Sequence, residues 1–174
     1  MKIITGIQQK KEIEMSKNKQ IDTLIAQYYA LCPLCSSPTM SPIDAEHKID
    51  DVQKELYTML GIDKENRDPK KKYLYKVLFS TKALDTALRT FLEIHSAWPC
   101  GTNPPSLGGY INALRKGGHP FNTLASHIAH TANIEIVDKR NEYLHIANKY
   151  PTRQEQEKIC DKILEFMQTV VDLT

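Results

Sequence analysis

Apolar side chains recur at helical spacing along most of the chain, and this pattern constrains the fold more than any other feature. The stretches 13–29, 49–60, 73–92 and 160–171 each place their apolar residues on one helical face. Amphipathic helices repeat apolar residues every three to four positions, whereas half-buried strands alternate them every second position. Such alternation is hard to find here, and glycine is scarce at 7 of 174 residues. The sequence therefore predicts an all-α fold, a bundle of about five to six helices.

Capping residues and helix breakers divide this pattern into segments. Three helix starts are predicted. At Ser41-Pro42 and Asp68-Pro69 a capping residue precedes a proline, and Thr152 with Glu155 forms a capping box. Helix ends are expected at Cys32-Pro33, Gly61, Trp98-Pro99 and Gly117-Gly118. A short helix is expected over 110–116 and a long one over about 122–150. The segment 99–109, rich in proline and glycine, is expected to be a surface loop of the kind that often carries function.

Length and charge limit the classes of protein to which the chain can belong. A length of 174 residues suits one helical domain over 1–174. The 23 basic and 21 acidic residues nearly balance, which excludes a strongly basic nucleic-acid-coating arm and a disordered acidic tail. No apolar run approaches the roughly 20 residues needed to span a bilayer. With residues 1–11 too short for a signal peptide and only 4 cysteines, a cytoplasmic protein is expected.

The string from Lys139 to His145, late in the expected long helix, contains Arg140, Asn141 and His145. It resembles the Arg-Asn-x-x-x-His signature of the HEPN superfamily, helical-bundle domains that often act as RNases. The position of the string before one last helix also matches that family. The resemblance spans about residues 70–172, with residues 1–60 as an N-terminal helical extension. Arg89 and His95 satisfy a looser Arg-to-His spacing, but they lack the asparagine and lie in an earlier helix.

The resemblance implies a metal-independent endoribonuclease that cleaves single-stranded RNA by attack of the ribose 2′-OH, with no cofactor. It also implies a homodimer with a composite site, and a toxin or phage-defence role with an antitoxin or nucleotidyltransferase as partner. Two other function classes stay open. One is a non-catalytic HEPN-like module that binds a nucleotide or a protein, and the other is a plain helical adaptor.

The three residue types of the motif suit this chemistry. Histidine titrates near pH 6.5 and can take the proton of a 2′-OH at neutral pH. Arginine offers a fixed positive fork for a phosphate on which charge develops, and Asn141 is placed to orient the phosphate or the histidine. Arg140 and His145 are five residues apart, about 140° around a helix. We expect them to flank a packed stripe of Val137, Leu144 and Asn148, so that a second, two-fold-related chain completes the site.

Two further sets of residues are candidates for the site. Asp85 falls on the apolar stripe of the helix that begins after Asp68, where an unpaired carboxylate is costly. The resemblance implies that such a residue faces Arg140 and holds it; a stripe-edge carboxylate that reaches water is the equal alternative. The run Lys70, Lys71 and Lys72, followed by Tyr73, is a candidate RNA-binding surface, although a solvated turn is the simpler interpretation.

Metal binding is not expected from the cysteines and histidines. Cys32 and Cys35 have the spacing of half a zinc site, but Cys100 and Cys160 are isolated, so two loop thiols are the simpler interpretation. His119, His127 and His130 lie within twelve residues of one another. A polar helix face explains these three histidines better than a metal site does.

Overall fold

The computed structural model describes residues 6–65, 68–97, 106–118 and 120–174. Its elements are α1 (Gly6–Leu31), the 3-10 turn η1 (Cys32–Leu34), α2 (Pro42–Glu65), α3 (Pro69–Ile94), α4 (Leu107–Lys116), α5 (Ser126–Ala132), the π-helical η2 (Asn133–Asp138), α6 (Lys139–His145) and α7 (Arg153–Val171). The segments α5, η2 and α6 follow one another without a break and form one long helix. No strand occurs in the described part of the chain, so the expected all-α bundle of five to six helices is confirmed.

The three predicted helix starts are confirmed by hydrogen bonds. The Ser41 hydroxyl accepts from the backbone N–H of Asp44 at 3.1 Å, and the Asp44 carboxylate accepts from the Ser41 N–H at 3.0 Å. The Asp68 carboxylate accepts from the N–H two residues on. Thr152 and Glu155 form the expected reciprocal capping box. Each cap satisfies donors that the first helical turn leaves without a partner.

Three predicted helix ends are wrong. The helix α3 ends at Ile94, before the expected end at Trp98-Pro99, and Ser96 just beyond it has a positive φ of 53°. The helix α2 passes through Gly61 and continues to Glu65, because Ile62 beyond the glycine is buried and extends the apolar stripe. The long helix begins at Ser126 and ends at His145, where the expected range was 122–150. It ends early because Ile146 adopts an extended backbone with φ −97° and ψ 116°. The loop expected over 99–109 is helical from Leu107 on, and residues 99–105 lie outside the described chain.

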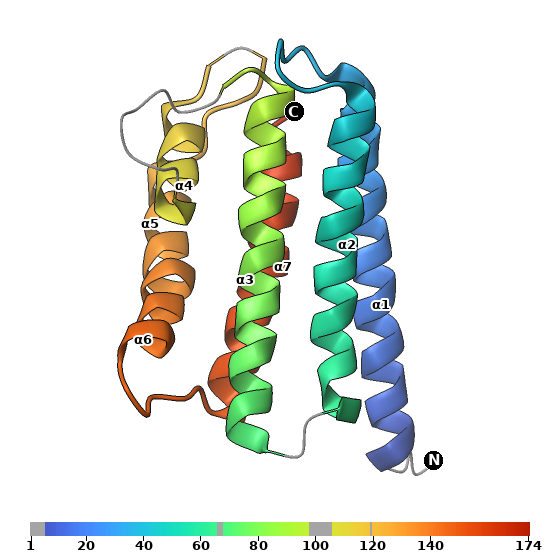
Figure 1. The fold of residues 1–174 in the computed structure, drawn as a ribbon, viewed down its shortest axis with the longest axis vertical. Coiled ribbons are helices and arrows are strands. Elements are labelled where there is room, and N and C mark those ends of the chain that lie inside the picture. The colour runs from blue at the N-terminus through green and yellow to red at the C-terminus, as the bar shows by residue number, and fades with distance from the viewer. Residues whose placement is uncertain (1–5, 66–67, 98–105, 119) are drawn as a thin grey trace.

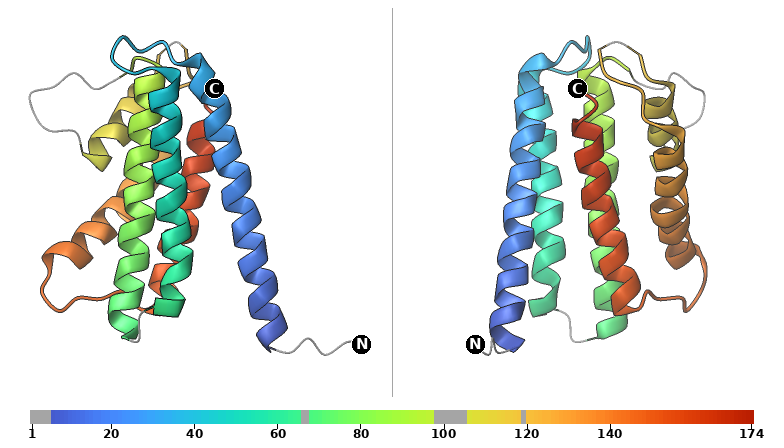
Figure 2. Two further views of the ribbon diagram at one scale, coloured as in Figure 1. Left: turned by 45° about the vertical axis from the view of Figure 1, so that its right-hand side comes forward. Right: turned by 180° about the vertical axis from the view of Figure 1, so that it is seen from behind.

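The helices form a layered bundle with α3 and α7 at its centre (Figure 1). The pair α1 and α2 covers one side, while α4 and the long helix α5–α6 cover the other (Figures 1 and 2). The central α3 is buried on most of its circumference, through Val77, Leu84, Leu88, Phe91 and other residues. Residues of α1 such as Leu24 join the same apolar core. None of the described helices is apolar over a stretch long enough to cross a bilayer.

Polar pairs connect neighbouring helices around this core. The hydroxyl of Tyr29 in α1 donates to Asp50 in α2, and the hydroxyl of Tyr57 in α2 donates back to Asp22 in α1. Further ion pairs join the other helices: Lys82 with Glu55, Lys48 with Glu93, Lys17 with Asp161 and Lys158 with Glu135. Exposed ion pairs contribute at most about 1 kcal/mol each, and one partner in each of these pairs is at least partly exposed, so burial of apolar side chains supplies most of the stability.

Candidate functional site

The buried face of the long helix is set by Ala129, Ala132, Ile136 and Tyr143. These positions follow one another at intervals of three, four and seven residues, which is the spacing of a single helical stripe. Arg140 occupies the position between Ile136 and Tyr143 in that series, and it is half-buried. The motif arginine is therefore half-buried on the side of the long helix that faces α3, with part of its surface open to solvent, and it does not flank the packed stripe as we expected.

The expected stripe of Val137, Leu144 and Asn148 is wrong. Leu144 is 39% exposed whereas Tyr143 is 5% exposed, and Asn148 is exposed beyond the end of α6 with a φ of 62°. The apolar residues of this segment permit two neighbouring registers. Packing selects the register that continues Ala129, Ala132 and Ile136, which are all buried.

Arg140 is held by its neighbour in the motif. Its guanidinium Nη1 donates a hydrogen bond to the side-chain oxygen Oδ1 of Asn141 at 3.0 Å. Both side chains are half-buried. Because Asn141 accepts with its carbonyl oxygen, its amide N–H₂ group remains as a donor. Asn141 therefore helps to fix the direction of the arginine fork and adds a donor beside it.

Asp85 lies across from this arginine on α3 and is half-buried. Burial raises the pKa of the Asp85 carboxyl, while the positive charges of Arg140 and then Arg89 act in the opposite direction. Tyr110, on α4, belongs to the same neighbourhood, since burial first and the Asp85 charge second raise its pKa. We refer to Asp85, Arg89, Tyr110, Arg140 and Asn141 as the inter-helix cluster. It gathers polar groups from α3, α4 and α6.

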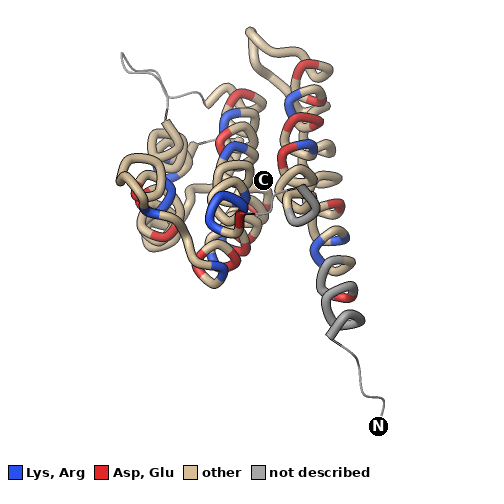
Figure 3. The backbone as a smooth tube through the Cα atoms, turned by 60° about the horizontal axis from the view of Figure 1, so that its bottom comes forward, with Lys and Arg blue, Asp and Glu red and all other residues tan. Residues whose placement is uncertain are grey.

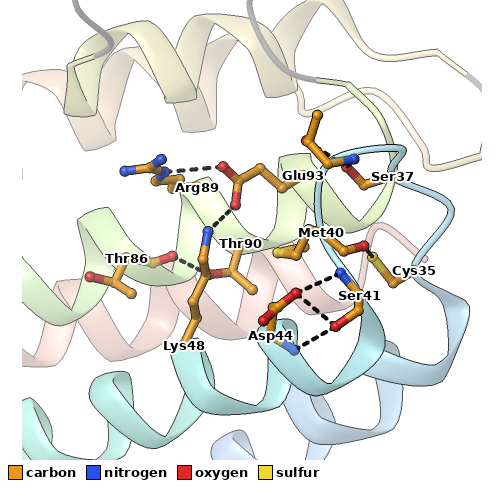
Figure 4. A network of polar contacts seen from close by, with 11 residues as sticks. Cys35, Ser37, Met40, Ser41, Asp44, Lys48, Thr86, Arg89, Thr90 and Glu93 are labelled. Atoms are coloured by element: carbon orange, nitrogen blue, oxygen red, sulfur yellow. Dashed lines mark hydrogen bonds and ion pairs between the residues drawn. The ribbon is translucent and has the colours of Figure 1, made fainter.

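The inter-helix cluster continues along α3 towards α2. Arg89 donates to the Glu93 carboxylate at 3.2 Å, one helical turn further on, and Lys48 of α2 pairs with the same carboxylate (Figure 4). Charges of opposite sign thus alternate from Lys48 through Glu93, Arg89 and Asp85 to Arg140. Glu93 is the member of this series that contacts two partners, Arg89 and Lys48, while Asp85 is linked to Arg140 and Arg89 through their charges.

Two members of the inter-helix cluster, Arg89 and Tyr110, were not predicted from the sequence. Arg89 was considered only as a chance match to the family spacing, although it stands four residues after Asp85 on the same helical face. The four-residue spacing between Asp85 and Arg89 was the feature of the sequence that could have placed Arg89 in the cluster. Tyr110 gave no signal, because its place beside Asp85 depends on how α4 packs on α3.

His145 stands apart from the inter-helix cluster. It is exposed and is the last residue of α6. It lies five residues after Arg140 on a regular α-helical segment, about 140° around the axis and 7.5 Å along it. One chain therefore presents Arg140 inward and His145 outward, so the two side chains do not converge on one point within a single copy.

The candidate RNA-binding residues lie at the beginning of α3. Lys70 and Lys71 are exposed, and the ammonium of Lys72 lies 5.8 Å from the centre of the Tyr73 ring. Lys70 is about 22 Å along α3 from Asp85. The lysine run is therefore not part of the inter-helix cluster. At this end of the bundle basic and acidic residues are interspersed (Figure 3).

The cysteines and histidines do not assemble into a metal site in the described part of the chain. No three His, Cys, Asp or Glu side chains among those residues lie together as a metal-binding group would. His127 and His130 are exposed on α5. His119 and Cys100 lie outside the described residues.

A scan against protein-family models and searches of curated proteins and solved structures give no match for this chain.

Proposed function

We propose that this protein is a metal-independent endoribonuclease of the HEPN type that acts on single-stranded RNA as a homodimer. The observation that carries the proposal is the setting of Arg140, which is half-buried and hydrogen-bonded to Asn141. The charge of Arg140 acts on the half-buried carboxyl of Asp85. An arginine directed in this way is prepared to bind a phosphate without reorganising, which is how preorganised donors lower a barrier.

The proposed reaction needs one base and one charge-stabilising group. His145 takes the proton of a ribose 2′-OH, and the resulting oxygen attacks the adjacent phosphorus. The bond to the 5′-oxygen breaks, and that oxygen leaves with a proton. The products are a 2′,3′-cyclic phosphate and a free 5′-OH, while Arg140 and Asn141 stabilise the charge on the phosphate.

The dimer is part of the proposal because, within a single copy, the guanidinium of Arg140 and the imidazole of His145 lie apart. The residues on either side of His145 in the chain carry exposed apolar side chains, since Leu144 is 39% exposed and Ile146 is 53% exposed. A second copy related by a two-fold axis would cover these side chains and bring its own His145 towards Arg140 of the first. Each of the two composite sites would then take its arginine and its histidine from different chains.

Mixing two inactive variants tests this arrangement. Arg140→Ala and His145→Ala are purified separately, confirmed inactive, then mixed, partly unfolded in urea and refolded together. Half of the dimers formed are mixed, and each mixed dimer holds one intact composite site. Activity should therefore return to about a quarter of that of the native protein treated in the same way. No recovery, with mixed dimers demonstrated by mass, would refute the composite site.

A second function is favoured by the same exposure of His145. A non-catalytic helical module would use Leu144, His145 and Ile146 as a contact surface for another protein, with the inter-helix cluster serving only stability. In that case both single variants would fold and dimerise normally, and the native protein would leave RNA intact.

A further inference from the structure

Cys32 and Cys35 lie in one tight turn between α1 and α2. The backbone N–H of Cys35 donates to the carbonyl of Cys32 at 3.1 Å, which closes the 3-10 turn η1. A turn with this bond brings the Cα atoms of its first and fourth residues within roughly 7 Å. Disulfides join Cα atoms that are about 4.4–6.8 Å apart. The backbone of this turn therefore holds the two Cα atoms near the separation that a disulfide requires.

Each thiol is engaged only by a weak contact in the reduced protein. The Cys32 Sγ lies 3.5 Å from the carbonyl oxygen of Tyr28, and the Cys35 Sγ lies 3.2 Å from the carbonyl oxygen of Met40 (Figure 4). A thiol is a weak hydrogen-bond donor. Rotation of the two side chains towards each other thus costs two weak bonds and requires no movement of a helix.

The two thiols differ in accessibility. Cys32 is fully buried, whereas Cys35 is half-buried and the next residue in the chain is exposed. Burial raises the pKa of the Cys32 thiol to about 11. A thiolate is the reactive form of cysteine. Reaction with a reagent from solution therefore begins at Cys35, and Cys32 serves as the internal partner.

We propose that Cys32 and Cys35 are a redox modification site that closes to a reversible disulfide. The oxidant is a small disulfide such as glutathione disulfide. The Cys35 thiolate attacks one of its sulfurs, which forms a mixed disulfide and releases one thiol. The Cys32 thiolate then attacks the Cys35 sulfur, closes the intramolecular bond and releases the second thiol. One external disulfide is reduced to two thiols as the protein loses two hydrogens.

The turn is connected to the end of α3 as well as to α1 and α2. The Ser36 backbone N–H donates to the carbonyl of Ile94 at 3.0 Å, and its hydroxyl donates to the same carbonyl at 3.2 Å. A disulfide one residue away fixes the position of Ser36 relative to α1. The disulfide is therefore expected to raise the midpoint of thermal unfolding and to slow opening of this end of the bundle.

Peptide mapping of the full-length protein tests the proposal directly. The native protein is incubated with glutathione disulfide at pH 8, alkylated under denaturing conditions and digested with trypsin. One tryptic peptide, residues 20–48, contains both Cys32 and Cys35, while Cys160 falls in the separate peptide 159–162. The expected result is a 20–48 peptide that lacks two hydrogens and carries no alkyl group. Cys160 is buried like Cys32. It should be alkylated as a free thiol, and it serves as the internal control.

Two variants distinguish the order of the steps. Cys32→Ser should retain a stable glutathione adduct on Cys35, and Cys35→Ser should leave Cys32 unmodified. The proposal is overturned if the native protein keeps a glutathione adduct on Cys35 without closing, or if the 20–48 peptide remains fully reduced. Modification of Cys160 at the same rate as Cys35 would likewise overturn it, since the reaction would then follow unfolding.

Discussion

The interaction between Asp85 and Arg140 makes a quantitative prediction. Exposed ion pairs contribute about 0–1 kcal/mol and removal of one partner of a fully buried pair costs about 3–5 kcal/mol. Asp85 and Arg140 are both half-buried, so a coupling free energy of about 1 kcal/mol is expected between them. A double-mutant cycle measures it through urea unfolding of the native protein, Asp85→Asn, Arg140→Met and the double variant at pH 7.

The pH dependence of the unfolding free energy gives a second check, because the direction of its change with pH can be predicted. Burial raises the pKa of Asp85 in the folded protein, so its charged form costs stability above that pKa, and the cost disappears as the pH falls and the carboxyl is protonated. Asp85→Asn should therefore match or exceed the native stability at pH 7 and lose this advantage at pH 3. The cycle of Asp85 with Arg89, whose charge acts more weakly on Asp85, is the matched control. A coupling between Asp85 and Arg140 below about 0.3 kcal/mol, or no larger than the control, would refute the assigned interaction.

Three other variants test the packing, the acid sensitivity and the surface charge. Tyr143→Ala should cost about 3 kcal/mol or more in urea unfolding, while Leu144→Ala should cost less than about 1 kcal/mol; equal costs would contradict the register of α6. Burial between aromatic rings lowers the pKa of His95, so the unfolded chain takes up the proton first and stability falls as the pH drops below about 6.5. His95→Leu should reduce that loss between pH 7 and 5, and an unchanged pH profile would contradict the assignment. Lys71→Gln should weaken RNA binding in a filter assay and reduce its dependence on salt, whereas unchanged binding would exclude the lysine run from the RNA surface.

Helix boundaries set by side-chain capping could be predicted from the sequence. Ser41, Asp68 and Thr152 accept hydrogen bonds from N–H groups two or three residues away, so the relevant partners lie next to them in the chain. The end of α2 could not be predicted in this way. Gly61 is an ordinary stop signal, but burial of Ile62 against other helices outweighs the small cost of a glycine within a helix.

The inward direction of Arg140 is the main feature that the sequence left unresolved. Ile136, Val137, Tyr143 and Leu144 offer two apolar registers, and only the neighbouring helices select between them. The choice turns Arg140 towards α3 and leaves Leu144 exposed. The position of Asp85 on an apolar stripe, by contrast, drew attention to this residue from the sequence alone, and in the structure it is half-buried with the charge of Arg140 acting on it.

Cleavage of RNA in the presence of EDTA tests the central proposal most directly. A labelled single-stranded RNA and a DNA of the same sequence are incubated with the native protein, Arg140→Ala, His145→Ala and His130→Ala. The last is a matched control, because His130 is an exposed histidine on the same long helix. We predict that the native protein and His130→Ala cut the RNA alone, with a 2′,3′-cyclic phosphate and a 5′-OH at the new ends. Loss of Arg140 or of His145 should slow cleavage by about two to four orders of magnitude. Intact RNA with the native protein, cleavage only after magnesium is added, or full activity of His145→Ala would contradict the account.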